Sequence, residues 1–368
     1  MRHLPNLTLT AALTVCTAMA VTGCGTSEAP APPASSAVPA APARPNGPLL
    51  YVSDETGGNV IVIDPAAGTV IERIAVGKRP RGIALTGDGT QLLVALSGSP
   101  IAGPGVDESK LPPADRAADG IGVVDLATHK VVRKFQSGPD PETFDLSPDG
   151  KTLYVSNEDT GEMSVVDVAG GTVTDHVKVG EEPEGVTVSP DGKEVYVTSE
   201  GDNSVSAIDT ATFKVLGTMK TGARPRSIAF TTDGATAFVT NENGGALTVI
   251  DAKKRKVVAT IPVPKPEGAP AVARPMQVQL SPDGKEVFAS LGRAGFVAVI
   301  DVATRKVKRL IGPVGARPWG MAFSADGTKL YTANGPSGDV SVVDVASGKV
   351  EQKIATGGSP WSVVVKNP

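Results

Sequence analysis

The most regular pattern in this chain is a short apolar run, such as Leu153-Tyr154-Val155-Ser156, that returns seven times. Alternation of Val, Ile, Thr and aromatic residues with a period of two predicts β-strands. The markers Tyr154, Tyr196 and Phe238 are each 42 residues apart, which is the length of one four-stranded propeller blade. The seven runs centre on Tyr51, Val94, Tyr154, Tyr196, Phe238, Phe288 and Tyr331.

Two further series keep step with the first. One is an aspartate that closes a strand such as Val60-Ile61-Val62-Ile63-Asp64, and the other is a proline. The aspartates are 64, 125, 167, 209, 251, 301 and 344, and the prolines are 80, 141, 183, 225, 275, 318 and 360. An aspartate repeated at one turn position is typical of scaffold, because its carboxylate can accept hydrogen bonds from nearby backbone amides. Seven copies of three markers predict an all-β protein with seven blades.

The phase of the repeat predicts how the ring closes. The first copy begins at its second strand, near Leu49, whereas the last complete copy is followed by 360–365, which has the pattern of a first strand alone. We therefore expect a seven-bladed β-propeller over 49–368, with a composite first blade closed by the C-terminal strand. Closure removes the open edges that a linear β array would expose. In the fourth blade we expect strands at 185–189, 194–199, 204–209 and 214–220.

The Tyr-Val-Ser/Thr-Asn strands, the Val-x-Val-Ile-Asp strands and the Ser-Pro-Asp-Gly turns resemble the YVTN-repeat β-propeller family over residues 49–366. Within that family, Arg79-Pro80-Arg81-Gly82, Glu182-Pro183-Glu184-Gly185 and Arg224-Pro225-Arg226 are similar to the β-propeller proteins associated with catabolism that depends on pyrroloquinoline quinone (PQQ). This resemblance implies a periplasmic protein connected with quinoprotein alcohol oxidation. It does not supply a reaction.

The N-terminus predicts export. Arg2 and His3 precede a modestly apolar run that is short for a membrane span. Val21-Thr22-Gly23-Cys24 resembles a bacterial lipobox, so we expect a lipoprotein-type signal peptide at 1–23 and lipidation of Cys24. The alternative is ordinary cleavage after Ala18-Met19-Ala20, which would leave the Cys24 thiol free. Cys16 lies in the part removed either way, so a disulfide within the mature chain is not expected.

Residues 24–48 are mostly Ala, Pro and Ser and predict an extended tether. The expected location is therefore the periplasmic or cell-surface face of a membrane, reached by the lipid anchor only. The formal net charge is −4, and the chain has no long basic run or basic motif with interleaved aromatics. Nucleic acid is therefore not an expected partner.

One face of the predicted disc is more variable than the other. The loop between the second and third strands of a blade shares a face with the loop that leads into the next blade. Both insertions in the repeat, 98–119 and 262–273, fall on this face. Loops on a rigid scaffold are where binding usually resides, so we expect the functional site here.

Residues flanking the seven prolines are expected to ring the central channel on that face, and both tryptophans of the chain are among them. The candidate ligand-binding residues are Arg79, Arg81, Glu142, Glu184, Arg224, Arg226, Arg274, Arg317, Trp319 and Trp361. Arginine and tryptophan together can grip a planar, carboxylated molecule through paired hydrogen bonds and stacking. The alternative is that Arg and Glu of adjacent loops form structural ion pairs while Trp plugs the channel. The acidic loops around Glu158, Asp159, Glu200 and Asp202 could hold Ca²⁺, although solvated carboxylates explain them equally well.

Catalytic patterns are mostly missing. His129 and His176 fall in different blades, so we expect no imidazole cluster for a metal, and there is no Gly-x-Ser-x-Gly elbow. The leading hypothesis is a non-enzymatic, membrane-tethered propeller that binds a small anionic ligand or a periplasmic protein, with PQQ or Ca²⁺ as possible ligands. A surface-interaction or structural module is the second hypothesis. The third is a propeller hydrolase or lactonase that uses acidic loop residues, since acid–base catalysis needs only two placed carboxyl groups.

Overall fold

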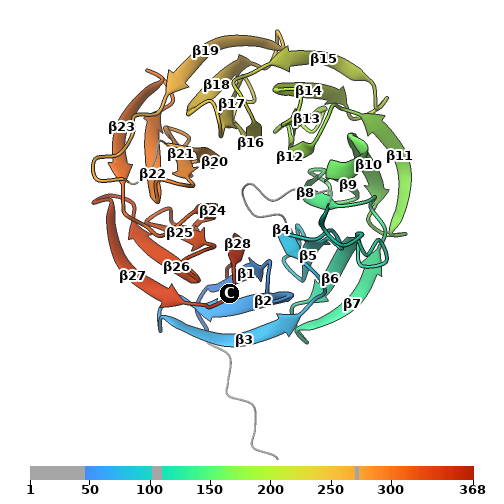
Figure 1. The fold of residues 1–368 in the computed structure, drawn as a ribbon, viewed down its shortest axis with the longest axis horizontal. Coiled ribbons are helices and arrows are strands. Elements are labelled where there is room, and N and C mark those ends of the chain that lie inside the picture. The colour runs from blue at the N-terminus through green and yellow to red at the C-terminus, as the bar shows by residue number, and fades with distance from the viewer. Residues whose placement is uncertain (1–45, 102–109, 270–272) are drawn as a thin grey trace, which may run out of the picture. The chain divides into compact units, whose positions relative to one another are not determined.

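Seven four-stranded antiparallel sheets are arranged in a ring in the computed structural model (Figure 1). The structure describes residues 46–101, 110–269 and 273–368. The expected signal peptide at 1–23, Cys24 and nearly all of the tether lie outside the described residues, as do parts of both insertions. No helix among the described residues is long and apolar enough to cross a membrane. The prediction of an all-β, seven-bladed propeller is confirmed.

Each blade runs from an innermost strand at the channel to an outermost strand at the rim. Blade 1 consists of β28 (Pro360–Lys366), β1 (Leu49–Asp54), β2 (Asn59–Asp64) and β3 (Thr69–Ala75). Blade 2 consists of β4 (Pro80–Leu85), β5 (Gln91–Leu96), β6 (Gly120–Asp125) and β7 (Lys130–Phe135). Blade 3 consists of β8 (Pro141–Leu146), β9 (Thr152–Asn157), β10 (Glu162–Asp167) and β11 (Thr172–Lys178), with the short 3₁₀ helix η2 (Glu158–Thr160) after β9.

The other four blades repeat the same order. Blade 4 consists of β12 (Pro183–Val188), β13 (Glu194–Ser199), β14 (Ser204–Asp209) and β15 (Val215–Lys220). Blade 5 consists of β16 (Pro225–Phe230), β17 (Thr236–Asn241), β18 (Ala246–Asp251) and β19 (Lys256–Pro262). Blade 6 consists of β20 (Pro275–Leu280), β21 (Glu286–Leu291), β22 (Phe296–Asp301) and β23 (Lys306–Ile311). Blade 7 consists of β24 (Pro318–Phe323), β25 (Lys329–Asn334), β26 (Asp339–Asp344) and β27 (Lys349–Ala355).

The composite blade is confirmed by the pairing of β28 with β1, in which Leu50 lies opposite Val365. The Asp54 carboxylate strengthens this closure, because its Oδ1 accepts a hydrogen bond from the Ser359 amide at 2.7 Å. The expected strand limits hold for the two middle strands of blade 4. The innermost strand was expected to start at 185 but starts at Pro183, because a bulge between Pro183 and Val186 keeps the proline in the ladder.

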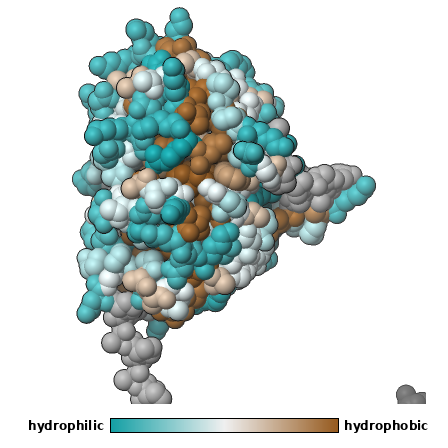
Figure 2. Space-filling model, turned by 90° about the vertical axis from the view of Figure 1, so that its left-hand side faces the viewer, coloured by the Kyte–Doolittle hydropathy of each residue, from teal (hydrophilic) through white to brown (hydrophobic). Residues whose placement is uncertain are grey.

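The core consists of seven apolar clusters, one at each contact between neighbouring blades. Between blades 4 and 5, for example, Tyr196 and Val205 of one blade pack against Ile228 and Phe230 of the next. Each fully buried side chain of this size contributes about 1.5–3 kcal/mol. The rim is more polar than the core. Figure 2, a view of one side of the molecule, shows mainly hydrophilic residues with a band of hydrophobic ones across them.

Hydroxyl groups in the second strand of a blade link it to the next blade. Ser156 Oγ donates to the Glu184 carbonyl at 2.6 Å, and Thr198 Oγ1 donates to the Arg226 carbonyl at 3.2 Å. Ser53, Thr240 and Ser290 make the corresponding bond in their own blades. The Ser or Thr that ends the recurring apolar run therefore fixes the innermost strand of the following blade.

The repeated aspartates hold the turns between the third and fourth strands. Asp209 Oδ1 accepts hydrogen bonds from the amides of Ala211 and Thr212 at 3.1 and 2.7 Å. The Thr212 hydroxyl and these amides keep the pKa of Asp209 below its usual value. Such bonds are local to the turn, as expected for scaffold.

Candidate functional site

The innermost strands of all seven blades enclose a cavity of about 730 Å³ along the central channel. Four of the residues predicted from the sequence line it: Glu184, Arg226, Trp319 and Trp361. The rest of its wall is formed by other residues of the innermost strands, among them Phe144, Met276 and Phe323. Gly185 shows how tightly these strands approach, since a Cβ there would lie 2.1 Å from the Arg226 carbonyl oxygen.

The candidate residues reach the channel mouth because of the backbone around each proline. The residue before the proline has a positive φ in five blades, at Arg79, Asp140, Glu182, Arg224 and Arg317, with values of 47° to 57°. This conformation is uncommon for residues other than glycine. The residue after the proline lies in the strand bulge. Proline and bulge together therefore turn two side chains per blade toward the mouth.

Arg226 is at the centre of a buried ionic cluster formed by blades 4 and 5. Its guanidinium lies 2.6 Å from Glu184 Oε1, 2.6 Å from Glu200 Oε1 and 3.1 Å from Glu242 Oε2. The three carboxylates and Arg226 are all buried. A buried charge that loses its partner is strongly unfavourable, so these four side chains hold each other in place.

The cluster contains more carboxylates than the arginines can fully stabilise. Burial raises the pKa of Glu200 to about 8 and raises that of Glu184, although Arg226 opposes both shifts. For Glu242 burial acts in the same direction, but Arg226 and Arg224 outweigh it and its pKa is lowered. Burial thus acts in the same direction on all three carboxyl groups, and only for Glu242 do the arginine charges prevail.

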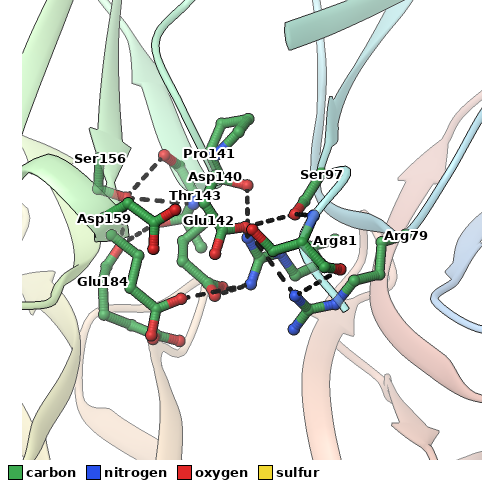
Figure 3. Close-up of polar contacts among 12 residues, drawn as sticks. Arg79, Arg81, Ser97, Asp140, Pro141, Glu142, Thr143, Ser156, Asp159 and Glu184 are labelled. Carbon is green, nitrogen blue, oxygen red and sulfur yellow. Dashed lines mark hydrogen bonds and ion pairs between the residues drawn. The ribbon is translucent and has the colours of Figure 1, made fainter. Parts of the chain in front are cut away.

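Arg81 forms a second buried cluster, between blades 2 and 3 (Figure 3). It is 1% exposed and pairs with Asp140 and Glu142, and it donates to the Pro141 carbonyl at 3.0 Å. Figure 3 shows its guanidinium pointing into this group of carboxylates. Burial favours the neutral form of Asp140, but the nearby Arg81 charge prevails and the pKa of Asp140 is lowered.

Three other candidate arginines also have acidic partners. Arg79 Nε lies 3.0 Å from Glu55, Arg224 Nε lies 2.6 Å from Glu200, and Arg274 Nη1 lies 3.5 Å from Glu242. Five of the six candidate arginines are thus in ion pairs of the kind that the structural alternative predicts. These pairs fix the loops of the mouth and compensate the positive charge of the candidate arginines in blades 2, 5 and 6.

Arg317, Trp319 and Trp361 form a different group, in blades 7 and 1. The tryptophan rings are stacked, with centroids 5.9 Å apart and an interplanar angle of 22°. The Arg317 guanidinium lies 4.3 Å from the centroid of Trp319, and that of Arg226 lies 5.2 Å from it. Among the described residues, no carboxylate lies within 4 Å of the Arg317 guanidinium.

One further repeat position explains why most of the mouth has arginine–carboxylate pairs whereas the sector around Arg317 has none. The sequence analysis did not use this position. Four residues after the Tyr or Phe marker the chain has Glu in blades 1, 3, 4 and 5 but Gly in blades 2, 6 and 7. The Glu residues are 55, 158, 200 and 242. Gly335 makes room for an indole, since a Cβ there would be 3.1 Å from Trp319 Nε1. Alignment of the repeats would have revealed Glu55 and Glu242.

Asp145 is a further residue that the sequence analysis missed. It lines the channel cavity, and its Oδ2 accepts the Val188 amide of the next blade at 2.8 Å. Burial raises its pKa to about 6. Other blades carry Ala84 or Thr187 at this repeat position, so a carboxyl group here stands out once the blades are aligned.

Within the described ranges, no group of three or more His, Cys, Asp and Glu side chains is placed to hold a metal ion. His129 lies 3.0 Å from the Tyr51 hydroxyl and 2.5 Å from Glu72, and His176 lies 3.3 Å from Ser164. Neither histidine lines the channel cavity.

Two family models match parts of this chain. The model for the lactonase, 7-bladed beta-propeller family matches residues 186–366, and the model for the YNCE-like beta-propeller matches residues 106–190. The uncharacterized protein YncE of Salmonella typhi and that of Salmonella typhimurium are each 27% identical over 110 residues, which are 30% of this chain. The match spans about a quarter of their length, 26%. These matches support the propeller resemblance and do not extend to PQQ.

Solved structures with the same fold come from several organisms. The periplasmic gluconolactonase PpgL of Pseudomonas aeruginosa is 21% identical over 87% of this chain and 99% of its own, with a TM-score of 0.70. A protein from Lactobacillus plantarum is 18% identical over 87% of this chain and 99% of its own, with a TM-score of 0.71. Hydrazine synthase of Kuenenia stuttgartiensis is 21% identical over 78% of this chain and 95% of that chain, with a TM-score of 0.63. At these identities the likeness shows the fold alone.

Proposed function

We propose that this protein binds a small anionic ligand in the sector of the channel mouth formed by Arg317, Trp319 and Trp361. The proposal rests on the difference between Arg317 and the other candidate arginines, which are in ion pairs with carboxylates. Arg317 is the one candidate arginine for which the described residues provide no carboxylate within 4 Å, and it lies against the tryptophan pair. The remaining candidates, Arg79, Arg81, Glu142, Glu184, Arg224, Arg226 and Arg274, act as the frame of the site.

The chemistry of this sector suits a planar acid. A guanidinium that stacks on an aromatic ring keeps its in-plane N–H donors available for a carboxylate. The half-buried indoles offer apolar ring surface beside the 730 Å³ cavity. PQQ is an anionic, planar molecule of this class and is our first candidate ligand.

The test uses the two tryptophans as reporters, because the chain has no others. The purified protein is titrated with PQQ, with and without Ca²⁺, and with benzoate as the simplest planar acid. Tryptophan fluorescence is followed with correction for ligand absorbance. We expect saturable quenching that weakens about tenfold or more in Arg317→Gln, since a charge-assisted hydrogen bond is lost.

Arg305→Gln is the matched control, because Arg305 is exposed in the turn between β22 and β23, on the other face of the disc. Quenching that is equal in the wild type and Arg317→Gln would refute the site. A flat response of the folded protein to all probes would also refute it and would favour capture of a periplasmic protein.

Opening of a lactone ring is the second candidate function. It is favoured by the raised pKa of Glu184 and Glu200 beside the channel cavity and by the match of residues 186–366 to the lactonase model. In such a reaction a carboxylate takes a proton from the water that attacks the lactone carbonyl, and a neutral carboxylic acid protonates the departing ring oxygen. Glu184 lines the cavity and is assigned the first role, and the second role is assigned to Glu200, whose pKa burial raises to about 8.

This candidate is tested with glucono-δ-lactone and a pH indicator. Turnover above the spontaneous rate that falls at least a hundredfold in Glu184→Gln, with folding intact, would support the reaction. If the wild-type protein hydrolyses the lactone no faster than the spontaneous reaction does, lactone opening is excluded.

The proposed location rests on the sequence of the expected signal peptide at 1–23 and of the segment that follows it. We propose that Cys24 carries a lipid and that 24–48 tether the propeller to a membrane of the periplasm. This arrangement suits a binding protein that meets its ligand or partner close to membrane-bound enzymes.

A further inference from the structure

A second cavity, of about 600 Å³, lies between blades 6 and 7 beside Arg317. It is lined by the loop after β21, by the connection between β23 and β24, and by Lys353 of β27. The charged residues in its lining are Arg293, Arg317 and Lys353, and no acidic residue is among them. We call it the blade 6/7 groove.

No carboxylate of the described residues forms an ion pair with the three cations of this groove. Neither Arg293 nor Lys353 has a carboxylate of this part of the chain within 4 Å, in contrast to the paired candidate arginines of blades 2, 5 and 6. Arg293 and Lys353 are exposed, whereas Arg317 is half-buried. Burial lowers the pKa of Arg317, and the nearby charges of Arg226 and Arg293 lower it further, although Glu242 acts in the opposite direction. Cations brought together without a counter-charge favour the binding of an anion.

The groove is continuous with the proposed ligand site through Arg317, whose side chain lines the groove and stacks on Trp319. Gly292, Gly295 and Gly315 also line the groove. The absence of side chains at these positions leaves the basic groups accessible to a ligand that extends from the channel mouth.

We propose that the blade 6/7 groove binds a second oxyanion, so that the ligand of this protein is a small molecule with two or more acid groups. One acid group binds beside the tryptophan pair, and the other binds at Arg293 and Lys353. This inference rests on the proposed function and adds the number of acid groups to it. A carboxylate and a phosphate group share the chemistry that the groove recognises.

The test compares benzoate, benzene-1,3-dicarboxylate and benzene-1,3,5-tricarboxylate by calorimetry and tryptophan quenching at constant ionic strength. A fourth probe, 3-phosphonobenzoate, distinguishes a phosphate-like second group from a carboxylate. We expect the probes with more than one acid group to bind at least tenfold more tightly than benzoate. The double variant Arg293→Gln/Lys353→Gln should lose this advantage and retain benzoate binding.

The matched control is Arg305→Gln/Lys349→Gln, which removes two exposed cations from the same two blades outside the groove. It should retain the advantage. Equal affinities for all four probes, or an advantage that survives in Arg293→Gln/Lys353→Gln, would overturn the inference while leaving the Arg317 site intact. Failure of benzoate and of every other probe to bind would refute both proposals.

Discussion

Replacement of Arg226 with methionine is the most direct test of the idea that paired arginines form the frame of the channel mouth. The substitution keeps a long, flexible side chain and removes the charge. Glu184, Glu200 and Glu242 would then be buried around a site with no cation at its centre. Arg224 would still reach Glu200 and Glu242. For Glu184, Arg226 is the one arginine within 4 Å among the described residues, so its carboxylate would lose its ion pair.

The expected cost is large because the whole group is buried. Removing one partner of a buried ion pair costs about 3–5 kcal/mol. With an unfolding entropy of about 2.1 cal/mol/K per residue, a propeller of about 320 residues loses about 4–7 °C in Tm. The loss should be smaller at pH 5 than at pH 8. The Arg226 charge holds down the pKa values of Glu184 and Glu200, so without it both carboxyls stay neutral at pH 5. They become unpaired buried charges, with their full cost, only as the pH rises.

The assay is thermal unfolding followed by far-ultraviolet circular dichroism at pH 5, 7 and 8. Arg255→Met is the matched control: Arg255 pairs with Glu194 at 2.6 Å, but the two side chains are 32% and 22% exposed. Because this pair is partly exposed, its loss should cost less than breaking the buried cluster. If Arg226→Met lowers Tm no more than Arg255→Met does, the argument that the cluster holds the mouth together is wrong.

Three further predictions concern single features. Glu200→Gln should reduce the fall in Tm between pH 5 and pH 8, because the wild-type carboxyl, with its pKa raised by burial to about 8, loses its stabilising proton in that range; an unchanged pH profile would exclude Glu200 as the titrating group. Gly185→Ala should cost about 1–3 kcal/mol in chemical unfolding, since its Cβ would lie 2.1 Å from the Arg226 carbonyl, whereas Gly87→Ala, with nothing within 4 Å, should cost much less. Cys24→Ala should abolish incorporation of labelled fatty acid and release the protein from membranes, and continued labelling would show that another residue carries the lipid.

The sequence predicts the fold well because the fold is built from a repeated unit. Each blade must bury both faces of its sheet against its neighbours, so the same apolar run, aspartate and proline recur in every unit. The closure could also be predicted, since 360–365 lack the three strands that should follow a first strand. Strand limits near the prolines could not, because the bulge after Pro183 depends on hydrogen bonds that no local pattern reveals.

The sequence predicted which residues lie at the channel mouth, but it did not predict which arginine forms an ion pair with which carboxylate. The sequence placed Arg226 and Glu184 in adjacent blades, but which arginine meets which carboxylate depends on side-chain directions at the mouth. Glu242 escaped notice because its significance appears only when the blades are aligned at the position after the strand marker. The groove at Arg293 escaped for another reason: its distinguishing property is the absence of a nearby acid, and this becomes visible only when loops of different blades are seen together.

The pairing of β1 with β28 has a consequence for synthesis of the chain. About 300 residues separate the two strands, and at about 5–20 residues per second a ribosome needs roughly 15–60 s to make them. During that interval β1 has an unpaired edge of the kind that attracts other strands. Folding of the ring is therefore completed after translation of the last blade. Until β28 is made, the edge of β1 is open to pairing with strands of other chains.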